Sequence, residues 1–425
     1  VQDFSATSQF RIKALFDVNG RTLTAELPRR FDTEEDARAF LESCIGASFN
    51  IANLETKPAK KSPAAPFTTS TLQQEASRKL GYSLSRTMKL AQDLYEQGHI
   101  SYMRTDSVNL SELAIEGAKA EVLSAYGAEY SNPKNYITKV ASAQEAHEAI
   151  RPTEFGTRGA GESDNHKKLY DLIWKRTVAS QMADAKLERT VATISVSTVP
   201  DSLVATGEVL IFDGFLKVYM ESSDEEHADD DDASSTSKML PPLSINQVLQ
   251  LQNMYANERF SRPPARYTEA SLVRKLEELG IGRPSTYAPT ISTIQARKYA
   301  VKEDRDGKPR ELRQLLLDGS TIHRTVEVEN TGAERSKLFP TDVGSVVTDF
   351  LMQHFEGIMD YGFTASVEKQ FDEIAHGQLK WTEMIRAFYV PFDAEVKKLR
   401  QENKELRQET EFLKKSAMYF ASLKK

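Results

Sequence analysis

The sequence has only one cysteine among its 425 residues, Cys44, and this scarcity limits the chemistry available to the chain. A single thiol excludes a disulfide framework within the chain and any zinc site built from several cysteines. We therefore expect a reducing compartment, the cytoplasm. No run of about 18 apolar residues occurs, so we expect no membrane-spanning helix. No secretory leader is expected either, and the start at Val1 suggests a fragment.

The sequence also lacks an excess of basic residues, since its formal net charge is −7 at pH 7. The net negative charge comes largely from eight acidic residues between Glu221 and Asp232. Without those eight, the 62 acidic residues would nearly match the 55 basic ones, so the charge does not exclude nucleic-acid binding. The stretch 221–237 has no apolar periodicity, which predicts a solvated, disordered loop. The alternative is a regulatory segment that mimics DNA.

Several local patterns predict secondary structure outside any functional motif. Alternating apolar residues on both sides of Asn19-Gly20 predict a β-hairpin over 10–27. Asp32 or Thr33 can cap a helix with an apolar face, and a β-rich region is expected over 191–219. The composition of the Pro/Ala/Lys-rich stretch 57–66 predicts a linker. The apolar face of the capped helix would contain Ala37, Phe40 and Leu41.

Two helix–turn–helix patterns recur about 200 residues apart. The first predicts helices over 70–81 and 83–98 and a short strand over 100–103. The second predicts helices over 268–279 and 285–298, followed by a hairpin around the turn at 304–307. Helix–turn–helix plus hairpin is the winged-helix plan of many DNA-binding proteins, and ordinary helical packing is the alternative. Further helices are expected from Ser111 and over 165–185.

The segment 100–110 contains the most informative spacing, because Tyr102, Arg104 and Asp106 occur at every second residue. On an extended strand these side chains would point to one face. A phenol, with a pKa of about 10, is a weak nucleophile at neutral pH. A guanidinium beside it favours the phenolate and neutralises charge on a phosphoryl transition state. The spacing therefore fits a tyrosine that attacks a phosphodiester, whereas a single Tyr–Arg pair would more often be structural.

Three stretches resemble motifs of the type IA DNA topoisomerases, in the order in which that family carries them. SYMRTDSVNLS at 101–111 resembles the active-site motif of bacterial topoisomerase I, and 66–100 resembles the helices that precede it. QEAHEAIRPT at 144–153 resembles the second active-site segment, and 263–295 resembles a DNA-contacting segment. The resemblance covers about residues 1–392 and favours topoisomerase I over topoisomerase III.

The resemblance implies a role for each residue that matches a motif. Tyr102 would form the 5′-phosphotyrosyl intermediate, Arg104 would stabilise the scissile phosphate, and Asp106 would help to position it. His147 would support charge transfer near the cleavage point, and Arg151 would contact DNA there. Four more residues would bind DNA at a helix start, where backbone N–H groups favour phosphate: Gly282, Arg283, Ser285 and Thr286. Their structural interpretation is an N-cap followed by a proline at the first helical position.

The resemblance also implies an activity and a metal. The partner would be single-stranded or underwound duplex DNA, and negative supercoils would be relaxed without ATP through a transient break in one strand. In the family, an N-terminal Toprim domain supplies a catalytic glutamate and the acidic cluster that holds Mg²⁺. We find no counterpart here, since Asp304-Arg305-Asp306 lies in a turn and lacks the following acid. With these metal ligands missing, we expect the chain alone to bind DNA without relaxing it.

The expected fold class is a multidomain α+β protein, the type IA topoisomerase toroid, with a β-rich gate arch, winged-helix-like α domains and a C-terminal coiled-coil helix. The expected domains are the first part of the arch at 1–61, the tyrosine-bearing domain at 62–187, the returning arch at 188–216, a basal DNA-binding α domain at 217–392 and a coiled-coil tail at 393–425.

The tail repeats two residue series every seven positions: Val396, Asn403, Thr410 and Ala417, and Leu399, Leu406, Leu413 and Phe420. These are the a and d positions of a coiled coil, and one asparagine at a favours a parallel pair. Attractive charge pairs flank the seam, Glu395 with Arg400, Glu402 with Arg407 and Glu409 with Lys414 of a partner. We expect a homodimer through 396–420; a solitary amphipathic helix is the alternative. Residues 399–420 resemble the leucine zipper of insertion-sequence transposase regulatory proteins, which suggests a fused or disrupted reading frame.

Two rival functions make different demands on the sequence. A tyrosine recombinase would place His-x-x-Arg before a C-terminal tyrosine, whereas here Tyr102 precedes His147 and the spacing to Arg151 is His-x-x-x-Arg. The other rival is a catalytically inactive protein that binds DNA and dimerises through its tail. A covalent DNA adduct on Tyr102 would distinguish the enzyme from this second rival.

Overall fold

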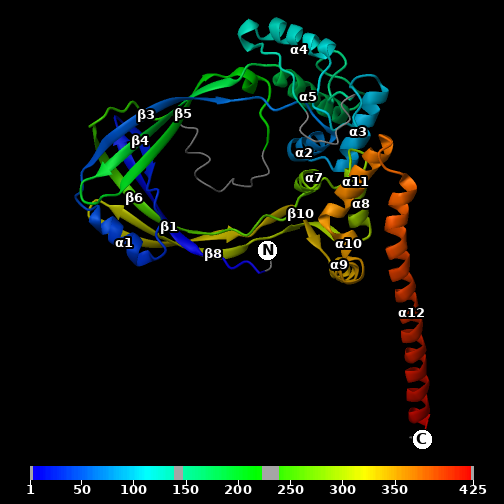
Figure 1. Cartoon of the computed structure of the whole chain (residues 1–425). Coiled ribbons are helices and arrows are strands. Elements are labelled where there is room, and N and C mark those ends of the chain that lie inside the picture. The colour runs from blue at the N-terminus through cyan, green and yellow to red at the C-terminus, as the bar shows by residue number, and fades with distance from the viewer. Residues whose placement is uncertain (1–2, 138–146, 223–238, 423–425) are drawn as a thin grey trace. The chain divides into compact units, whose positions relative to one another are not determined.

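A computed structural model describes residues 3–137, 147–222 and 239–422 of the chain (Figure 1). Contacts between residues divide the chain into two compact units. Of the described residues, unit 1 contains 3–137, 147–272 and 302–339, and unit 2 contains 273–301 and 340–422. Each unit therefore joins segments that are distant in the sequence. The α+β class is confirmed.

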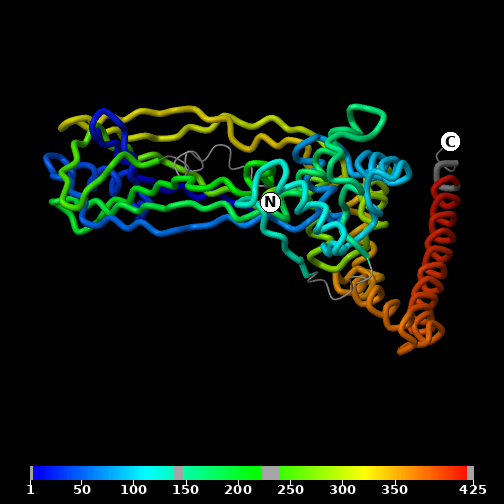
Figure 2. The backbone as a smooth tube through the Cα atoms, turned by 90° about the horizontal axis from the view of Figure 1, so that it is seen from above, coloured from blue at the N-terminus to red at the C-terminus, as the bar shows by residue number. Residues whose placement is uncertain are grey.

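The strands of unit 1 form an eight-stranded antiparallel sheet, and they run side by side in Figure 2. Its order is β1-β2-β5-β4-β3-β6-β8-β9, and β1 also pairs with β6, so the first six strands close into a ring. The strands are β1 (Ser8–Val18), β2 (Arg21–Glu26), β3 (Phe49–Lys61), β4 (Ala185–Val196), β5 (Ser202–Phe212), β6 (Val248–Phe260), β8 (Lys308–Asp318) and β9 (Thr321–Thr331). Residues 217–392, expected to form a helical basal domain, thus contribute three strands to this sheet.

The predicted hairpin at the start of the chain is confirmed as β1 and β2. Its two turn residues, Asn19 and Gly20, have φ values of 53° and 79°. A two-residue turn with both φ values positive matches the twist of the flanking strands, and Asn-Gly is the preferred pair for it. The alternating apolar residues of β1, such as Phe10 and Phe16, are fully buried in the core of the sheet.

The helix predicted after Thr33 is also confirmed, as α1 (Glu34–Ser43). Thr33 Oγ1 accepts a hydrogen bond from the backbone N–H of Asp36 (3.1 Å), which satisfies a donor that the first helical turn leaves free. The buried residues of α1 are the three predicted ones, Ala37, Phe40 and Leu41, and they join the core of the sheet.

The linker predicted over 57–66 is wrong over its first half, which belongs to β3. Residues Lys57 to Lys61 pair with β4, in register Lys57 with Arg189 and Lys61 with Ala185. Only Phe49 and Asn50 of β3 also pair with β6, so the rest of β3 has one partner strand. A proline such as Pro58 is tolerated on such an edge because its missing N–H leaves no ladder bond unmade. Composition alone could not reveal this pairing.

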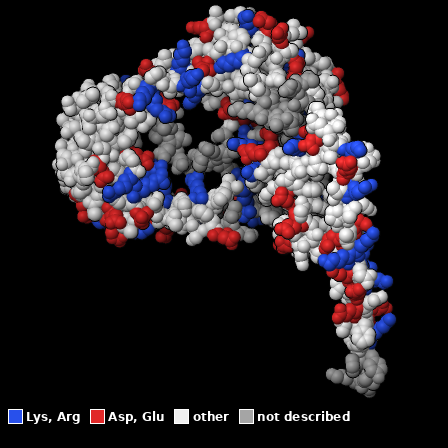
Figure 3. Space-filling model, viewed as in Figure 1, with Lys and Arg blue, Asp and Glu red and all other residues white. Residues whose placement is uncertain are grey.

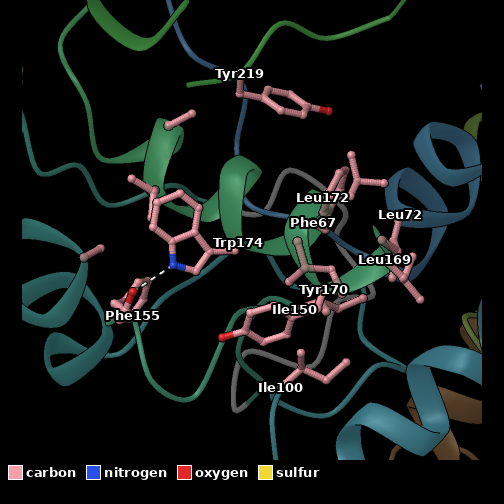
Figure 4. Packing of buried hydrophobic residues seen from close by; sticks show 14 of the residues in the cluster. Phe67, Leu72, Ile100, Ile150, Phe155, Leu169, Tyr170, Leu172, Trp174 and Tyr219 are labelled. Atoms are coloured by element: carbon pink, nitrogen blue, oxygen red, sulfur yellow. Dashed lines mark hydrogen bonds between the residues drawn. The ribbon is translucent and has the colours of Figure 1, made fainter. Parts of the chain in front are cut away.

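The helical part of unit 1 follows the predicted helices closely. It contains α2 (Thr69–Leu80), α3 (Leu84–Glu96), α4 (Glu112–Ala125), η1 (Ala128–Tyr130), α5 (Asp164–Ser180) and η2 (Gly214–Lys217). Ser83 and Ser111 cap α3 and α4 as expected, and Gly81 ends α2 at φ 66°. A second hydrophobic core lies among these helices (Figure 4). In it, Trp174 Nε1 of α5 donates to Phe155 O at 2.8 Å.

The predicted resemblance between the two helix–turn–helix patterns extends to their hydrogen bonds. Before α2, the Thr68 and Thr71 side chains each accept from the other residue's backbone N–H (3.2 and 2.9 Å). Before α7 (Glu269–Glu278), Thr268 and Ser271 repeat the arrangement at 3.1 and 2.9 Å. Gly280 follows α7 at φ 68°, as Gly81 follows α2. The two patterns therefore use the same start and stop signals.

The hairpins that would complete two winged helices are absent from the described residues. After the second pattern, β7 (Ala300–Arg305) pairs with β10 (Glu334–Pro340) in a two-stranded sheet, while β8 pairs with β6 and β9. The hairpin predicted around 304–307 is therefore wrong. The strand after that turn finds longer partners in the large sheet, and sequence periodicity cannot choose between partner strands.

Unit 2 is helical among its described residues. It contains the end of α7 and the helices α8 (Tyr287–Ala296), α9 (Asp342–His354), α10 (Glu356–Met359), α11 (Tyr361–Ala375) and α12 (Trp381–Ser422). Aromatic rings of α12 pack against the preceding helices, with Phe388 5.9 Å from Phe363 and Phe392 5.6 Å from Phe355 between ring centroids. This cluster ties the first part of α12 to unit 2.

The acidic loop predicted over 221–237 falls mostly outside the described residues. Its first acid is described: Glu221 Oε1 accepts from Arg176 Nη1 at 2.9 Å, and that arginine is buried. No helix in the described part of the chain is long and apolar enough to cross a membrane.

Candidate functional site

Tyr102 lies in an irregular segment that follows α3, and not in the strand predicted over 100–103. The segment has one isolated β-bridge, between Ile100 and Pro152, so it forms no ladder. The predicted strand is therefore wrong, because side-chain hydroxyl groups take over much of the backbone hydrogen bonding here. The exposure still alternates as the two-residue period requires. Tyr102 and Arg104 are exposed. Met103, which lies between them, and Thr105, which follows Arg104, are almost fully buried.

Thr69, at the start of α2, holds the backbone that follows Tyr102. Its Oγ1 donates to Met103 O (2.8 Å) and accepts from the backbone N–H of Thr105 (2.9 Å). Its own backbone N–H donates to Thr105 O at 2.8 Å. Thr69 is fully buried, so water does not compete for these bonds. The backbone that carries Tyr102 is therefore fixed to a helix start.

The second motif lies directly beside the first. Ser101 Oγ donates to Ala149 O at 2.7 Å and accepts from the backbone N–H of Arg151 at 2.9 Å. The backbone N–H of Ser101 donates in turn to Arg151 O at 2.9 Å. Thus the residue before Tyr102 is bonded to the stretch that contains His147 and Arg151. Two segments about 50 residues apart in sequence meet at the tyrosine.

Arg151 is paired within its own segment. Its Nε and Nη2 donate to Glu148 Oε2 at 3.0 and 2.7 Å, and Glu148 Oε1 accepts from the backbone N–H of Ser111 at 2.7 Å. Burial acts to raise the pKa of the Glu148 carboxyl, but the bonds from Ser111 and Arg151 outweigh it and leave the pKa lowered. Glu148 therefore stays ionised and orients the guanidinium at neutral pH.

The remaining predicted catalytic groups are less constrained. No hydrogen bond or ion pair joins Arg104, Asp106 or His147 to another described residue, Tyr102 included. His147 is half-buried and stands two residues before Ala149, so the backbone holds it near the tyrosine segment. Their proposed roles stay predictions.

The four residues predicted to bind DNA at a helix start lie in unit 2, before α8. Gly282 has a φ of 87°, and an added Cβ would meet Thr286 Oγ1 at 2.9 Å, so this position requires glycine. Thr286 is the N-cap, but its Oγ1 accepts from the backbone N–H of Arg283 (2.8 Å) and does not cap the helix. Pro284 precedes the cap, so the interpretation of a proline at the first helical position is wrong. Ser285 is exposed beside it.

Arg283 is shared with two carboxylates of α11. Its Nε lies 3.6 Å from Glu368 Oε2 and its Nη2 lies 3.5 Å from Asp372 Oδ2. These distances are long for charge-assisted bonds, so a phosphate with better geometry could compete for the guanidinium.

Comparisons with known proteins agree with these motifs. The sequence model of the DNA topoisomerase family matches residues 1–333. The chain is 42% identical over 360 residues to DNA topoisomerase 1 of Zymomonas mobilis, and the match covers 84% of this chain and 27% of that protein. It is 44% identical over 366 residues to DNA topoisomerase 1 of Mycolicibacterium smegmatis, and the match covers 84% of this chain and 36% of that protein. This chain belongs to the type IA DNA topoisomerase family.

The fold comparison gives the same result. The structure of full-length topoisomerase I from Thermotoga maritima matches with a TM-score of 0.72 and 31% sequence identity, over 93% of this chain and 59% of that one. The prokaryotic-type DNA topoisomerase 1 of Acanthamoeba polyphaga mimivirus is 42% identical, covering 82% of this chain and 43% of that protein. This topoisomerase chain therefore spans less than half the length of the curated relatives named here.

Sequence reasoning missed several residues that shape the site in this topoisomerase chain. Thr69 and Ser101 brace the tyrosine segment, Glu148 orients Arg151, and Tyr95 of α3 places its ring centroid 5.2 Å from that of Tyr102. Their residue types occur in many helix caps and loops, so no local signal distinguishes them. A metal site is not formed by the described residues, because no three His, Cys, Asp or Glu side chains gather there.

Proposed function

We propose that this chain carries the tyrosine that cuts and rejoins one DNA strand in a type IA topoisomerase reaction. The observation that carries the proposal is the meeting of the two active-site motifs at an exposed tyrosine, through the bonds of Ser101 to Ala149 and Arg151. Family membership supports single-stranded or underwound DNA as the substrate, and relaxation of negative supercoils without ATP as the outcome for the whole protein. The cytoplasm is the compartment that we infer.

The chemistry assigned to Tyr102 is a transesterification. Its Oη attacks the phosphorus, an Oη–P bond forms, and the bond from phosphorus to the 3′ oxygen breaks. The phenolic proton leaves, and the departing 3′ oxygen gains a proton. The energy of the phosphodiester is kept in the 5′-phosphotyrosyl bond, so attack by the 3′ hydroxyl reseals the strand without ATP.

The neighbouring groups fit this step by their chemistry. Arg104 can hold the scissile phosphate with two parallel N–H bonds and favour the phenolate. Asp106 can help to position the phosphate, and His147 can exchange a proton near it. Arg151, oriented by Glu148, would contact the DNA backbone, as would the helix start at Gly282, Arg283, Ser285 and Thr286.

The Mg²⁺ of the family needs several oxygen ligands that converge on one point. The described residues offer no group of three His, Cys, Asp or Glu side chains, and so they do not fit that ion. No step is therefore assigned to a metal on this chain. A general acid for the 3′ oxygen is likewise not assigned to a described residue.

The test uses a substrate that needs no general acid. A single-stranded oligonucleotide with a bridging 3′-S-phosphorothiolate has a thiol leaving group, whose pKa of about 8.5 lies far below that of an alcohol. We expect the chain to form a denaturation-resistant adduct with it. Tyr102→Phe should form none, because it lacks the attacking oxygen.

Two results would overturn the proposal. One is an adduct that persists at the wild-type level in Tyr102→Phe, which would place the nucleophile elsewhere. The other is DNA binding by the wild-type chain without any adduct, which would favour the inactive DNA-binding protein. Tyr126→Phe removes a phenolic oxygen outside the two motifs and serves as the matched control.

We also propose that the tail pairs two copies of the chain through 396–420. The tail continues as helix in α12, which is 42 residues and so roughly 60 Å long. Leu406 and Leu413, on the predicted seam, are 61% and 58% exposed. Basic and acidic side chains are both visible along this helix in Figure 3. An exposed apolar seam with flanking charges supports a parallel pair.

A further inference from the structure

We propose that Tyr95 is a positioning residue for Tyr102, which holds the ring of the nucleophile in the orientation needed for attack. The inference rests on the proposed role of Tyr102. The two ring centroids lie 5.2 Å apart with the ring planes at 69°, an edge-to-face arrangement. This geometry is attractive because the positive edge of one ring meets the negative face of the other.

The backbone between the two tyrosines makes their separation a fixed property of the fold. After Tyr95, α3 ends, and the backbone N–H groups of Gly98 and His99 donate to Tyr95 O and Leu94 O, both at 2.9 Å. Gly98 has a φ of 75°, which reverses the chain direction at little cost because glycine has no Cβ. The chain then returns past Tyr95 to Tyr102.

Both ends of this connection are anchored in the core. Leu94 is fully buried on one side of Tyr95, and Ile100 is 1% exposed on the way to Tyr102. Thr153 Oγ1 donates to Gly98 O at 2.7 Å, so the turn itself is tied to the second motif. The backbone that carries Tyr95 is thus held in place on the side that leads to Tyr102.

Tyr102 needs such a contact because its own side chain is loosely surrounded. It is 43% exposed, and among the described residues Tyr95 is the aromatic ring within contact distance of it. An exposed side chain divides its time among three staggered χ1 orientations, and only one can direct Oη at a given phosphorus. A ring contact that favours the productive orientation raises the fraction of molecules ready to react.

The same exposure argues that the pair is not merely a part of the core. Tyr95 is 40% exposed, so its side chain buries less area than a core residue does and contributes less to folding stability. Aromatic pairs contribute enough beyond buried area to change a rate by about 2- to 12-fold. The effect of losing Tyr95 should therefore include a slower cleavage step, beyond any loss of stability from the buried part of the ring.

The experiment compares Tyr95→Leu, Tyr95→Phe and Glu96→Ala with the wild-type chain on the 3′-S-phosphorothiolate oligonucleotide. The rate constant for adduct formation is measured at saturating DNA, and the dissociation constant for an unmodified oligonucleotide is measured separately. We expect Tyr95→Leu to cleave about 2- to 12-fold more slowly at unchanged affinity, and Tyr95→Phe to cleave at the wild-type rate. Glu96→Ala changes the neighbouring exposed residue, which contacts Gln92, and should have no effect.

Three outcomes would overturn the inference: wild-type cleavage by Tyr95→Leu, a loss confined to DNA affinity, or a loss in Tyr95→Phe as large as in Tyr95→Leu. The second would make Tyr95 a stacking surface for a base. A readout independent of activity separates failure here from failure of the proposed function. The ring signal of Tyr102 in NMR of ring-labelled tyrosine, assigned by its loss in Tyr102→Phe, should shift in Tyr95→Leu and stay in place in Tyr95→Phe.

Discussion

At the scale of single residues, the site depends on small polar side chains that replace a β-ladder. Thr69 fixes the backbone after Tyr102, and Ser101 fixes the backbone before it. Each is short enough to reach main-chain groups and has few rotamers to lose, so it holds its partners at little entropic cost. The side chain of Tyr102 stays exposed while hydrogen bonds hold the backbone on both sides of it.

The first prediction concerns the hydroxyl of Thr69. Thr69→Val keeps the shape of the side chain but leaves the buried N–H of Thr105 without its partner. We expect a loss of about 1–3 kcal/mol in the free energy of unfolding and slower adduct formation, because the tyrosine segment loosens. Denaturant unfolding and the adduct assay measure the two effects.

Two controls test this interpretation. Thr69→Ser keeps the hydroxyl and should retain most of the adduct rate. Thr87→Val removes another fully buried hydroxyl, one that donates to Ser83 O within α3, and should affect stability alone. If Thr87→Val slowed the adduct as much as Thr69→Val, a general loss of stability would explain both.

At the scale of elements, one charged cluster joins three strands and a helix. Glu258 of β6 accepts from Arg313 of β8 at 2.8 and 2.5 Å. Glu34 of α1 accepts from Arg313 at 3.4 Å and from Arg324 of β9 at 2.7 Å. Glu258 is only 2% exposed, so its charge depends on these partners. The cluster fixes how β8 and β9 extend the ring of strands.

The second prediction concerns acid sensitivity. The hydrogen bond from Arg313 lowers the pKa of Glu258 from 4.5 to about 2, against the opposing effect of burial. Because the folded-state pKa is the lower one, the carboxylate stabilises the fold above pH 4.5, and this contribution is lost as the pH falls towards 2. At pH 3 the loss should be about 2 kcal/mol. Unfolding free energies measured at pH 7 and pH 3 test it.

Glu258→Gln should weaken the fold at pH 7 and reduce its sensitivity to acid between pH 4.5 and pH 2. Glu303→Gln is the control, because that carboxylate pairs with Arg305 on the surface, where both side chains are about half exposed. Equal acid sensitivity in the wild type and in Glu258→Gln would contradict the role given to this buried carboxylate.

At the scale of the whole molecule, the charged residues of α12 bear on whether two copies of the chain pair. Ion pairs within the last part of this helix use Lys397, Lys398 and Lys415. The charges predicted to pair across a dimer lie elsewhere on the helix: Glu402, Arg407, Glu409 and Lys414. Glu395 is the exception, since it also accepts from His354 Nδ1 at 3.2 Å, and this contact competes with its expected pairing to Arg400.

The third prediction follows from this surface. The mass measured by sedimentation should rise from monomer towards dimer with increasing protein concentration. Leu406→Lys together with Leu413→Lys should weaken the association at least ~100-fold, because each buried leucine contributes about 1.5–3 kcal/mol. Phe412→Lys is the matched control, since Phe412 is 68% exposed on the same helix but lies off the seam. A monomer at every concentration, or equal effects of both changes, would exclude the pairing.

The sequence by itself determined those features that depend on neighbours in the chain. The turn at Asn19-Gly20, the cap at Thr33 and the stop at Gly81 each follow from a residue's own backbone preference, and all three are confirmed. The tyrosine motif is a local feature of the same kind, because its consecutive residues are enough to recognise it. Local preference is readable because it acts over a few residues, whatever the rest of the fold does.

Only the tertiary structure decided which distant segments meet. It extended β3 through Pro58, paired β7 with β10 and not with β8, and replaced the expected strand at Tyr102 by bonds from Thr69 and Ser101. These outcomes depend on which partners remain for each backbone group after the long strands and the core have formed. Buried backbone groups must find partners, and residues far away in the sequence supply them.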